Sequence, residues 1–178
     1  MLTRLQHFWL FVRWWPWLML WAEYRHVLQG MRGFCGRVPS ILQQPLPQAM
    51  HEISQPDAAA AHLPEPHIRD LADLAALLER RSPLGLCLRR SLVRYHYLRP
   101  LGLPLELKFG AKLLGQPEKR GLTGHAWLTL HGHPYHEADA NWQGFTIMYT
   151  YGGETERLET ERLRDWETGD WETERLGD

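Results

Sequence analysis

The residues of this chain that are best suited to covalent chemistry are Cys87 and His125, with two acids shortly after the histidine. A thiolate attacks carbonyl carbons, and an imidazole within reach removes the thiol proton and holds the resulting ion pair. The imidazole in turn needs an acceptor for its second ring nitrogen. Glu137 and Asp139 are the two candidates, so the sequence predicts a catalytic triad of Cys87, His125 and one of these acids.

A helix is expected to position Cys87 at its start, near Gly85–Cys87, and to run to Leu98 before Pro100. Backbone N–H groups without partners and the positive end of the helix dipole stabilise a thiolate at such a start. One side of this helix is predicted to be apolar (Leu88, Leu92, Tyr95 and Leu98), with most arginines on the other (Arg89, Arg90, Arg94 and Arg99).

Strands are expected to position the histidine and the acids, because the apolar period changes from 3.6 to 2 after residue 104. An amphipathic helix over residues 67–81 precedes the helix of Cys87. The order of helices first and strands second predicts an α+β domain with an antiparallel sheet over residues 67–153. The predicted strands contain Leu105–Phe109, His125–Leu130 and Phe145–Tyr151.

The turn after the strand of His125 decides which acid reaches the imidazole. A three-residue loop over residues 131–133 would place Asp139 opposite His125, with Glu137 as a diagonal neighbour on the same face. A loop of even length would turn both acids to the other face. The strand register therefore tests the predicted triad.

Two motifs carry a resemblance to a known family: Cys87-Leu88-Arg89-Arg90-Ser91-Leu92 and Gly124-His125-Ala126-Trp127. With the chain from about Ile68 to Tyr151, they resemble the transglutaminase-like cysteine peptidases of lasso peptide biosynthesis, of the leader-peptidase type. The resemblance implies a papain-like fold in which Cys87 attacks the bond between leader and core peptide and His125 is the base. It assigns the third position to Glu137, twelve residues after the histidine, where the family usually has aspartate; Asp139 stays the alternative.

The resemblance also implies the partners of this chain. Fused members of the family carry a leader-binding module before the peptidase, whereas residues 1–66 look like Trp-rich helices and a proline-rich segment. It therefore implies the split form, with a lasso precursor peptide as substrate and two further proteins, a separate leader-recognition protein and an ATP-dependent lasso cyclase. No metal or organic cofactor is expected.

Composition limits the class of protein. The 178 residues carry 20 Lys+Arg against 21 Asp+Glu, which is typical of one soluble globular domain with some extra sequence and gives no case for nucleic acid. Two cysteines, Cys35 and Cys87, suit a reducing compartment, so we expect the cytoplasm. Residues 154–178, where ten acidic side chains outnumber four basic ones, are predicted to be a disordered tail; the alternative is an arm anchored by Trp166 and Trp171.

The N-terminal segment is apolar over residues 8–21 but is interrupted by Arg13 and Pro16. The uninterrupted apolar stretch is therefore too short for a helix that spans a membrane. Two predictions for residues 1–37 stay open. The first is a pair of helices split at Pro16 that packs on the core or on a partner. The second is an interfacial helix, peripheral to the inner membrane face, whose arginines meet anionic lipid (Arg4, Arg13, Arg25 and Arg32). Residues 38–66 contain six prolines and are predicted to be a surface linker.

Three other interpretations compete with a peptidase. The first is a zinc site built from the histidines of the turn and one acid, namely His131, His133, His136 and Asp139. The second is a non-catalytic transglutaminase-like module that docks a peptide or the maturation proteins. The third keeps the thioester and transfers the acyl group to an amine instead of water.

Overall fold

The structure is a computed structural model, and it describes residues 4–55, 60, 62–114 and 121–152. Helices come first in this part of the chain: α1 (Arg4–Leu20), α2 (Ala22–Ile41), α3 (Leu46–Ser54), α4 (Glu65–Leu78), α5 (Leu86–Leu98) and the 3-10 turn η2 (Arg99–Leu101). The sheet follows: β1 (Leu105–Leu114), β2 (Gly121–Leu130), β3 (His133–Pro134), the short helix α6 (Asp139–Trp142) and β4 (Thr146–Gly152). The predicted α+β class, with helices before an antiparallel sheet, is confirmed.

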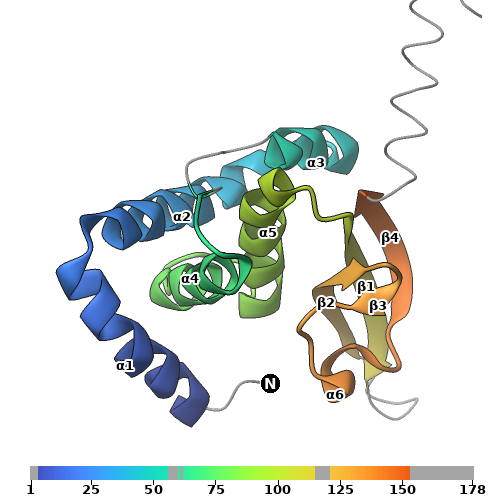
Figure 1. The fold of residues 1–178 in the computed structure, drawn as a ribbon. Coiled ribbons are helices and arrows are strands. Elements are labelled where there is room, and N and C mark those ends of the chain that lie inside the picture. The colour runs from blue at the N-terminus through green and yellow to red at the C-terminus, as the bar shows by residue number, and fades with distance from the viewer. Residues whose placement is uncertain (1–3, 56–59, 61, 115–120, 153–178) are drawn as a thin grey trace, which may run out of the picture.

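Helix α5 lies between the other helices and the sheet (Figure 1). Every residue from Arg89 to Leu98 is buried, so this helix has no solvent-facing side over that range. The predicted start near Gly85–Cys87 and end at Leu98 are confirmed. Its arginines are buried together with its leucines because acceptors on α4 and after β3 meet them.

The sheet has the strand order β3-β2-β1-β4, and each neighbouring pair is antiparallel. Leu107 pairs with Leu128, and both side chains belong to the core against the helices. Because successive residues of a strand point to opposite faces, Trp127 lies on the other face, where Phe145 approaches it. The three predicted strands are all present.

Helix α1 continues through Pro16 and ends at Leu20, so the predicted split at Pro16 is wrong. A proline inside a helix leaves the carbonyl four residues earlier without its N–H partner. That carbonyl belongs to Val12, which lies on the exposed side of α1, where water is available. The break comes instead at Trp21, which is extended, and Arg25 donates hydrogen bonds to the last carbonyls of α1.

The predicted surface linker over residues 38–66 is wrong where α3 forms. Ala49, Met50 and Ile53 of this helix are fully buried in the same core as α5. Proline is tolerated in the first turn of a helix, where the N–H would lack a partner in any case, so Pro47 does not prevent α3. The prolines of this segment therefore mark helix starts as well as turns.

Within the described ranges, no helix is long and apolar enough to cross a membrane. The predicted acidic tail, residues 154–178 with Trp166 and Trp171, lies outside the described residues.

Candidate active site

Cys87 is the second residue of α5 and is half-buried. A hydrogen bond with His125 is the main cause that lowers the pKa of Cys87, and burial of the thiol opposes it. The backbone N–H groups of Ala126 and Leu88 also donate to the sulfur and favour the thiolate. The other cysteine, Cys35, is fully buried, and that burial raises its pKa to about 11. The two thiols therefore differ strongly in reactivity.

His125 in β2 connects the sulfur to an acid. Its Nε2 atom lies 3.7 Å from Oε1 of Glu137. In the described part of the chain, no acceptor lies within hydrogen-bonding distance of this nitrogen. Burial by itself lowers the pKa of His125, but the interactions with Cys87 and Glu137 outweigh it and raise the pKa to about 9. A depressed thiol pKa beside a raised imidazole pKa favours a thiolate–imidazolium pair at neutral pH.

Aromatic rings hold the plane of the imidazole. Trp127 stacks on His125 with 5.7 Å between ring centroids and 16° between planes, and Phe145 approaches at 5.4 Å. Gly110 of β1 lies opposite His125 in the sheet, and a Cβ there would come within 2.8 Å of the Trp127 ring. A glycine at this position is therefore required for the indole to lie against the imidazole.

Glu137 is the acid that faces the histidine. Arg90 donates to its Oε2 atom and Asn141 donates to Oε1 at 2.8 Å. Burial raises the pKa of Glu137, but His125 and the positive charge of Arg90 dominate and lower it to about 2. The carboxylate is thus ionised beside the imidazole. Asp139 begins α6, and its side chain lies outside the described part of the structure.

Glu137 does not reach His125 through the expected strand register. The turn after β2 has two residues, His131-Gly132, and Leu130 pairs with His133, so the predicted three-residue loop is wrong. Both turn residues have positive φ, as a tight two-residue hairpin requires. The chain then leaves the ladder, and His136 has a φ of 48°. Glu137 is placed by contacts with α5 instead.

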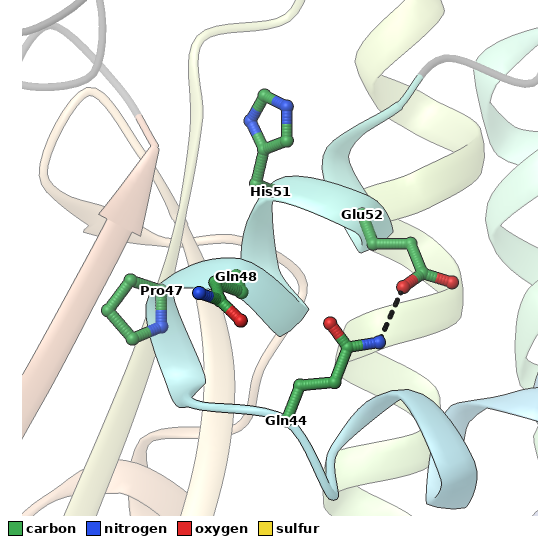
Figure 2. Close-up of a pocket in the computed structure, with 5 residues that line it drawn as sticks. All are labelled: Gln44, Pro47, Gln48, His51 and Glu52. Carbon is green, nitrogen blue, oxygen red and sulfur yellow. Dashed lines mark hydrogen bonds between the residues drawn. The ribbon is translucent and has the colours of Figure 1, made fainter.

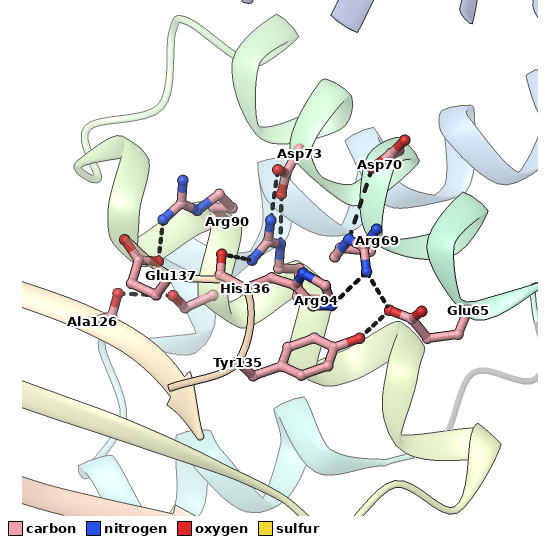
Figure 3. Close-up of polar contacts among 11 residues, drawn as sticks. Glu65, Arg69, Asp70, Asp73, Arg90, Arg94, Ala126, Tyr135, His136 and Glu137 are labelled. Carbon is pink, nitrogen blue, oxygen red and sulfur yellow. Dashed lines mark hydrogen bonds and ion pairs between the residues drawn. The ribbon is translucent and has the colours of Figure 1, made fainter. Parts of the chain in front are cut away.

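Arg94 of α5 is the next contact that holds the segment of Glu137 (Figure 3). Its guanidinium makes two hydrogen bonds to Asp73 of α4, at 2.6 and 2.7 Å. The same group donates to the carbonyl of His136 at 3.4 Å. Arg90 and Arg94 lie one helical turn apart. Arg90 thus holds the carboxylate of Glu137, and Arg94 holds the backbone of His136.

Helix α4 completes this polar cluster from the other side (Figure 3). Arg69 lies 2.7 Å from Nε2 of His136 and 2.9 Å from Glu65. Glu65 also accepts a hydrogen bond from the Tyr135 hydroxyl. The segment over residues 135–137 is therefore fixed against α4 and α5 by side chains. Its backbone is also held to β2 by one hydrogen bond, from the N–H of Tyr135 to the carbonyl of Leu128.

The sequence reasoning misses Arg90 and Asn141 as partners of the acid. Helical spacing could have predicted that residues of α5 lie near the site. Arg90, Ser91 and Arg94 follow Cys87 by three, four and seven residues, which places them on its face of the helix. Ser91 uses this position to donate to the carbonyl of Ala126 at 2.9 Å, which ties α5 to β2. Asn141 carried no comparable signal, because α6 has only four residues.

A cavity of about 250 Å³ opens at the thiol and the imidazole. Leu88 and Phe109 supply apolar walls, and Gly110 and Gly124 leave room between them. A larger hollow of about 500 Å³ lies beside α3 (Figure 2). Its side chains are all exposed, and it contains neither a thiol nor a buried acid: Gln44, Pro47, Gln48, His51 and Glu52. The cavity at Cys87 is therefore the candidate active site.

The histidines of the rival zinc site do not converge. His131 and His133 are exposed at the turn, and His136 is hydrogen-bonded to Arg69. In the part of the chain that the structure describes, no group of three or more His, Cys, Asp or Glu side chains is arranged to hold a metal ion.

One of three comparisons with known proteins found a match. The family model described as the transglutaminase-like superfamily matches residues 40–150, a range that runs from the end of α2 to β4 and contains Cys87, His125 and Glu137. Comparison with the curated proteins and with the solved structures found no match. Because the matched range spans more than half of the chain, this protein belongs to the transglutaminase-like superfamily.

Proposed function

We propose that this protein is a cysteine peptidase that removes the leader from a ribosomally made lasso precursor peptide. The observation that carries the proposal is Cys87 at a helix start, in one cavity with an imidazole whose Nε2 faces an ionised, buried Glu137. Membership of the transglutaminase-like superfamily supports cysteine chemistry. The lasso assignment is supported by the motifs of residues 87–92 and 124–127.

The reaction begins with the Cys87 thiolate, which forms a bond to the carbonyl carbon of the scissile peptide. The carbonyl π electrons move to oxygen, and the N–H of Cys87 is suited to stabilise this oxyanion because it has no helical acceptor at the second position of α5. His125 donates its proton to the leaving nitrogen, the C–N bond breaks, and the core peptide departs as a free amine.

The second half of the reaction regenerates the enzyme. His125, now neutral, takes a proton from water, whose oxygen attacks the thioester carbon. The C–S bond breaks, the leader departs with a free carboxylate, and the thiolate–imidazolium pair returns. Glu137 stays ionised throughout and stabilises the imidazolium that forms at each end of the cycle.

The partners in this proposal are those of the split form of the family. A separate leader-recognition protein delivers the precursor, and a separate ATP-dependent cyclase closes the released core peptide. The exposed surface beside α3 leaves room for proteins to bind without covering the cavity at Cys87.

The test is cleavage of a lasso precursor from the same gene neighbourhood, with its leader-recognition protein, followed by mass spectrometry. We expect two fragments whose masses sum to the precursor plus one water. Cys87→Ala and His125→Ala should abolish cleavage, whereas the matched control Cys35→Ala should retain it, because that thiol is fully buried in the core.

Each other outcome has a definite meaning. Cleavage by Cys87→Ala at the wild-type rate would overturn the cysteine mechanism. Precursor binding without cleavage by a protein whose Cys87 is unreactive would favour the non-catalytic module. A product heavier by an added amine, in place of water, would favour acyl transfer to that amine.

A further inference from the structure

Helix α1 lies at the side of the molecule away from the sheet (Figure 1). Two buried side chains, Trp14 and Leu18, attach it to the core. The Trp14 indole N–H donates to Asp70 at 3.3 Å, and its ring packs on His67 with 5.1 Å between centroids. The helix is therefore held firmly along one side, which fixes the direction in which its other side points.

The outer side of α1 is apolar, although it faces solvent. Surface helices ordinarily place polar residues there, and contiguous exposed apolar patches mark binding surfaces. Leu20 is the extreme case, with 78% of its surface exposed. We name the outer face of α1 by its exposed large apolar side chains: Trp9, Val12, Trp15, Trp17, Met19, Leu20 and, at the corner to α2, Trp21.

Arginines outnumber acids in helices α1 and α2. Residues 4–41 contain five arginines and a single acid, Glu23, which is itself paired with His62. Arg13 and Arg32 approach carboxylates of the fold at 3.4 and 3.9 Å, yet 65% and 48% of their side chains stay exposed. The exposed charge that α1 itself presents, Arg13, is therefore positive and complements an anionic partner.

An anionic lipid surface fits this face better than a protein does. Protein interfaces use about one hydrogen bond per 100–200 Å². The sequence of α1 contains no carboxylate, and its exposed side chains are mostly apolar rings and alkyl groups, so few hydrogen-bond acceptors are on offer. Tryptophan with arginine on a helix that lies flat is instead the composition that lipid headgroups and the upper acyl chains accept.

We propose that the outer face of α1 binds the surface of an anionic lipid bilayer, with the helix axis in the membrane plane. Membrane contact on this side leaves the sheet, whose strands β1 and β2 line the cavity at Cys87, on the other side of the molecule (Figure 1). A peptide substrate reaches the site from solution while the protein stays at the membrane. The proposal does not depend on the peptidase function, because none of its residues line that cavity.

The experiment is co-sedimentation of the full chain with vesicles of phosphatidylglycerol and phosphatidylcholine, and with vesicles of phosphatidylcholine alone. We expect binding to the anionic vesicles at least tenfold tighter than to the neutral ones, weakened by raised salt, with a blue shift of tryptophan fluorescence. Leu20→Glu should weaken anionic-vesicle binding at least tenfold, because it places a charge in the apolar face.

Leu113→Glu is the matched control, since Leu113 is a leucine with 72% of its surface exposed, on β1 far from α1. It should bind the anionic vesicles like wild type, and circular dichroism should show that both variants are folded. Equal binding by wild type and Leu20→Glu, or no binding to anionic vesicles, would overturn the proposal. Self-association of the chain that Leu20→Glu abolishes, without vesicle binding, would assign this face to a second copy instead.

Discussion

Arg90 and Glu137 form an ion pair in which only 10% and 2% of the two side chains are exposed. The arginine binds Oε2, so that Oε1 is left to Asn141 and His125. A charge buried without a partner costs several kcal/mol, so Arg90 and His125 together keep the acid at this position ionised. Arg90 is thus a positioning residue for the acid that faces the histidine.

Replacement of Arg90 by methionine should therefore weaken the interaction between Glu137 and His125. We expect a loss of about 3 kcal/mol in the free energy of unfolding, because the carboxylate is left buried without its cation. The pKa of Glu137 should rise, and the pKa of Cys87 should rise with it because the carboxylate is no longer held in place beside the imidazolium. Urea unfolding and the pH profile of Cys87 alkylation measure the two effects.

The exposed Arg81 provides the control for this variant. Arg81→Met removes the same charge from the chain but should change the unfolding free energy by less than about 0.5 kcal/mol. An alkylation profile in Arg90→Met that coincides with wild type would show that Arg90 supports the fold alone and does not tune the site.

Alkylation should separate the two thiols of the wild-type protein. We expect iodoacetamide to label Cys87 at pH 7 and to leave Cys35 unmodified, because burial raises the pKa of Cys35 to about 11 and a hydrogen bond with His125 lowers the pKa of Cys87. In a Cys35→Ser background, His125→Ala should move the profile of Cys87 toward that of an ordinary thiol, near pH ~8.5. If His125→Ala left the pH profile of Cys87 alkylation unchanged, the proposed mechanism would lose its physical basis.

Local patterns predicted the elements that carry the nucleophile and the base. The helix start near Cys87 and the alternation around His125 depend on neighbouring residues along the chain, so the sequence is sufficient to find them. The route of Glu137 was not predictable in this way, because it depends on the left-handed His136 and on contacts with Arg90 and Arg94 from another element.

The same distinction explains the errors in the first half of the fold. Pro16 and Pro47 look like breaks when only the chain is considered. Tertiary burial decides otherwise: α1 is attached through Trp14 and Leu18 on either side of Pro16, and α3 through Met50 and Ile53. Packing energy from such residues exceeds the local preference against a helix.

Stability should depend on pH in a way that the site determines. The pKa of Glu137 is lowered to about 2 in the folded protein from an ordinary value of 4.5. The ionised form is therefore bound more tightly in the fold, and its contribution of about 3 kcal/mol is present above pH 4.5 and lost as the pH falls toward 2. Urea unfolding of wild type and Glu137→Gln from pH 7 to pH 2 should show their difference shrinking in that window.

At alkaline pH the free energy of unfolding should depend on pH in the opposite direction and fall as the pH rises. The pKa of His125 is raised to about 9, so its contribution is fully present below pH 6.5 and is lost as the pH rises through 9. His125→Gln should lack this alkaline loss, which wild type shows. A difference between wild type and Glu137→Gln that stays constant from pH 7 to pH 2 would contradict the ionised state of the buried acid.

The close approach of Trp127 to β1 gives the last prediction. A Cβ on Gly110 would lie 2.8 and 2.9 Å from atoms of the Trp127 ring and 3.0 Å from Cβ of Phe145, so Gly110→Ala must displace the indole that stacks on His125. We expect a loss of about 1–3 kcal/mol in the free energy of unfolding and slower alkylation of Cys87 at pH 7. Gly36→Ala is the matched control, since nothing lies within 4 Å of its added Cβ in the interior of α2, and it should stabilise by about 1 kcal/mol. If Gly110→Ala stabilised the protein as Gly36→Ala does, a glycine at residue 110 would not be required for Trp127 to stack on His125.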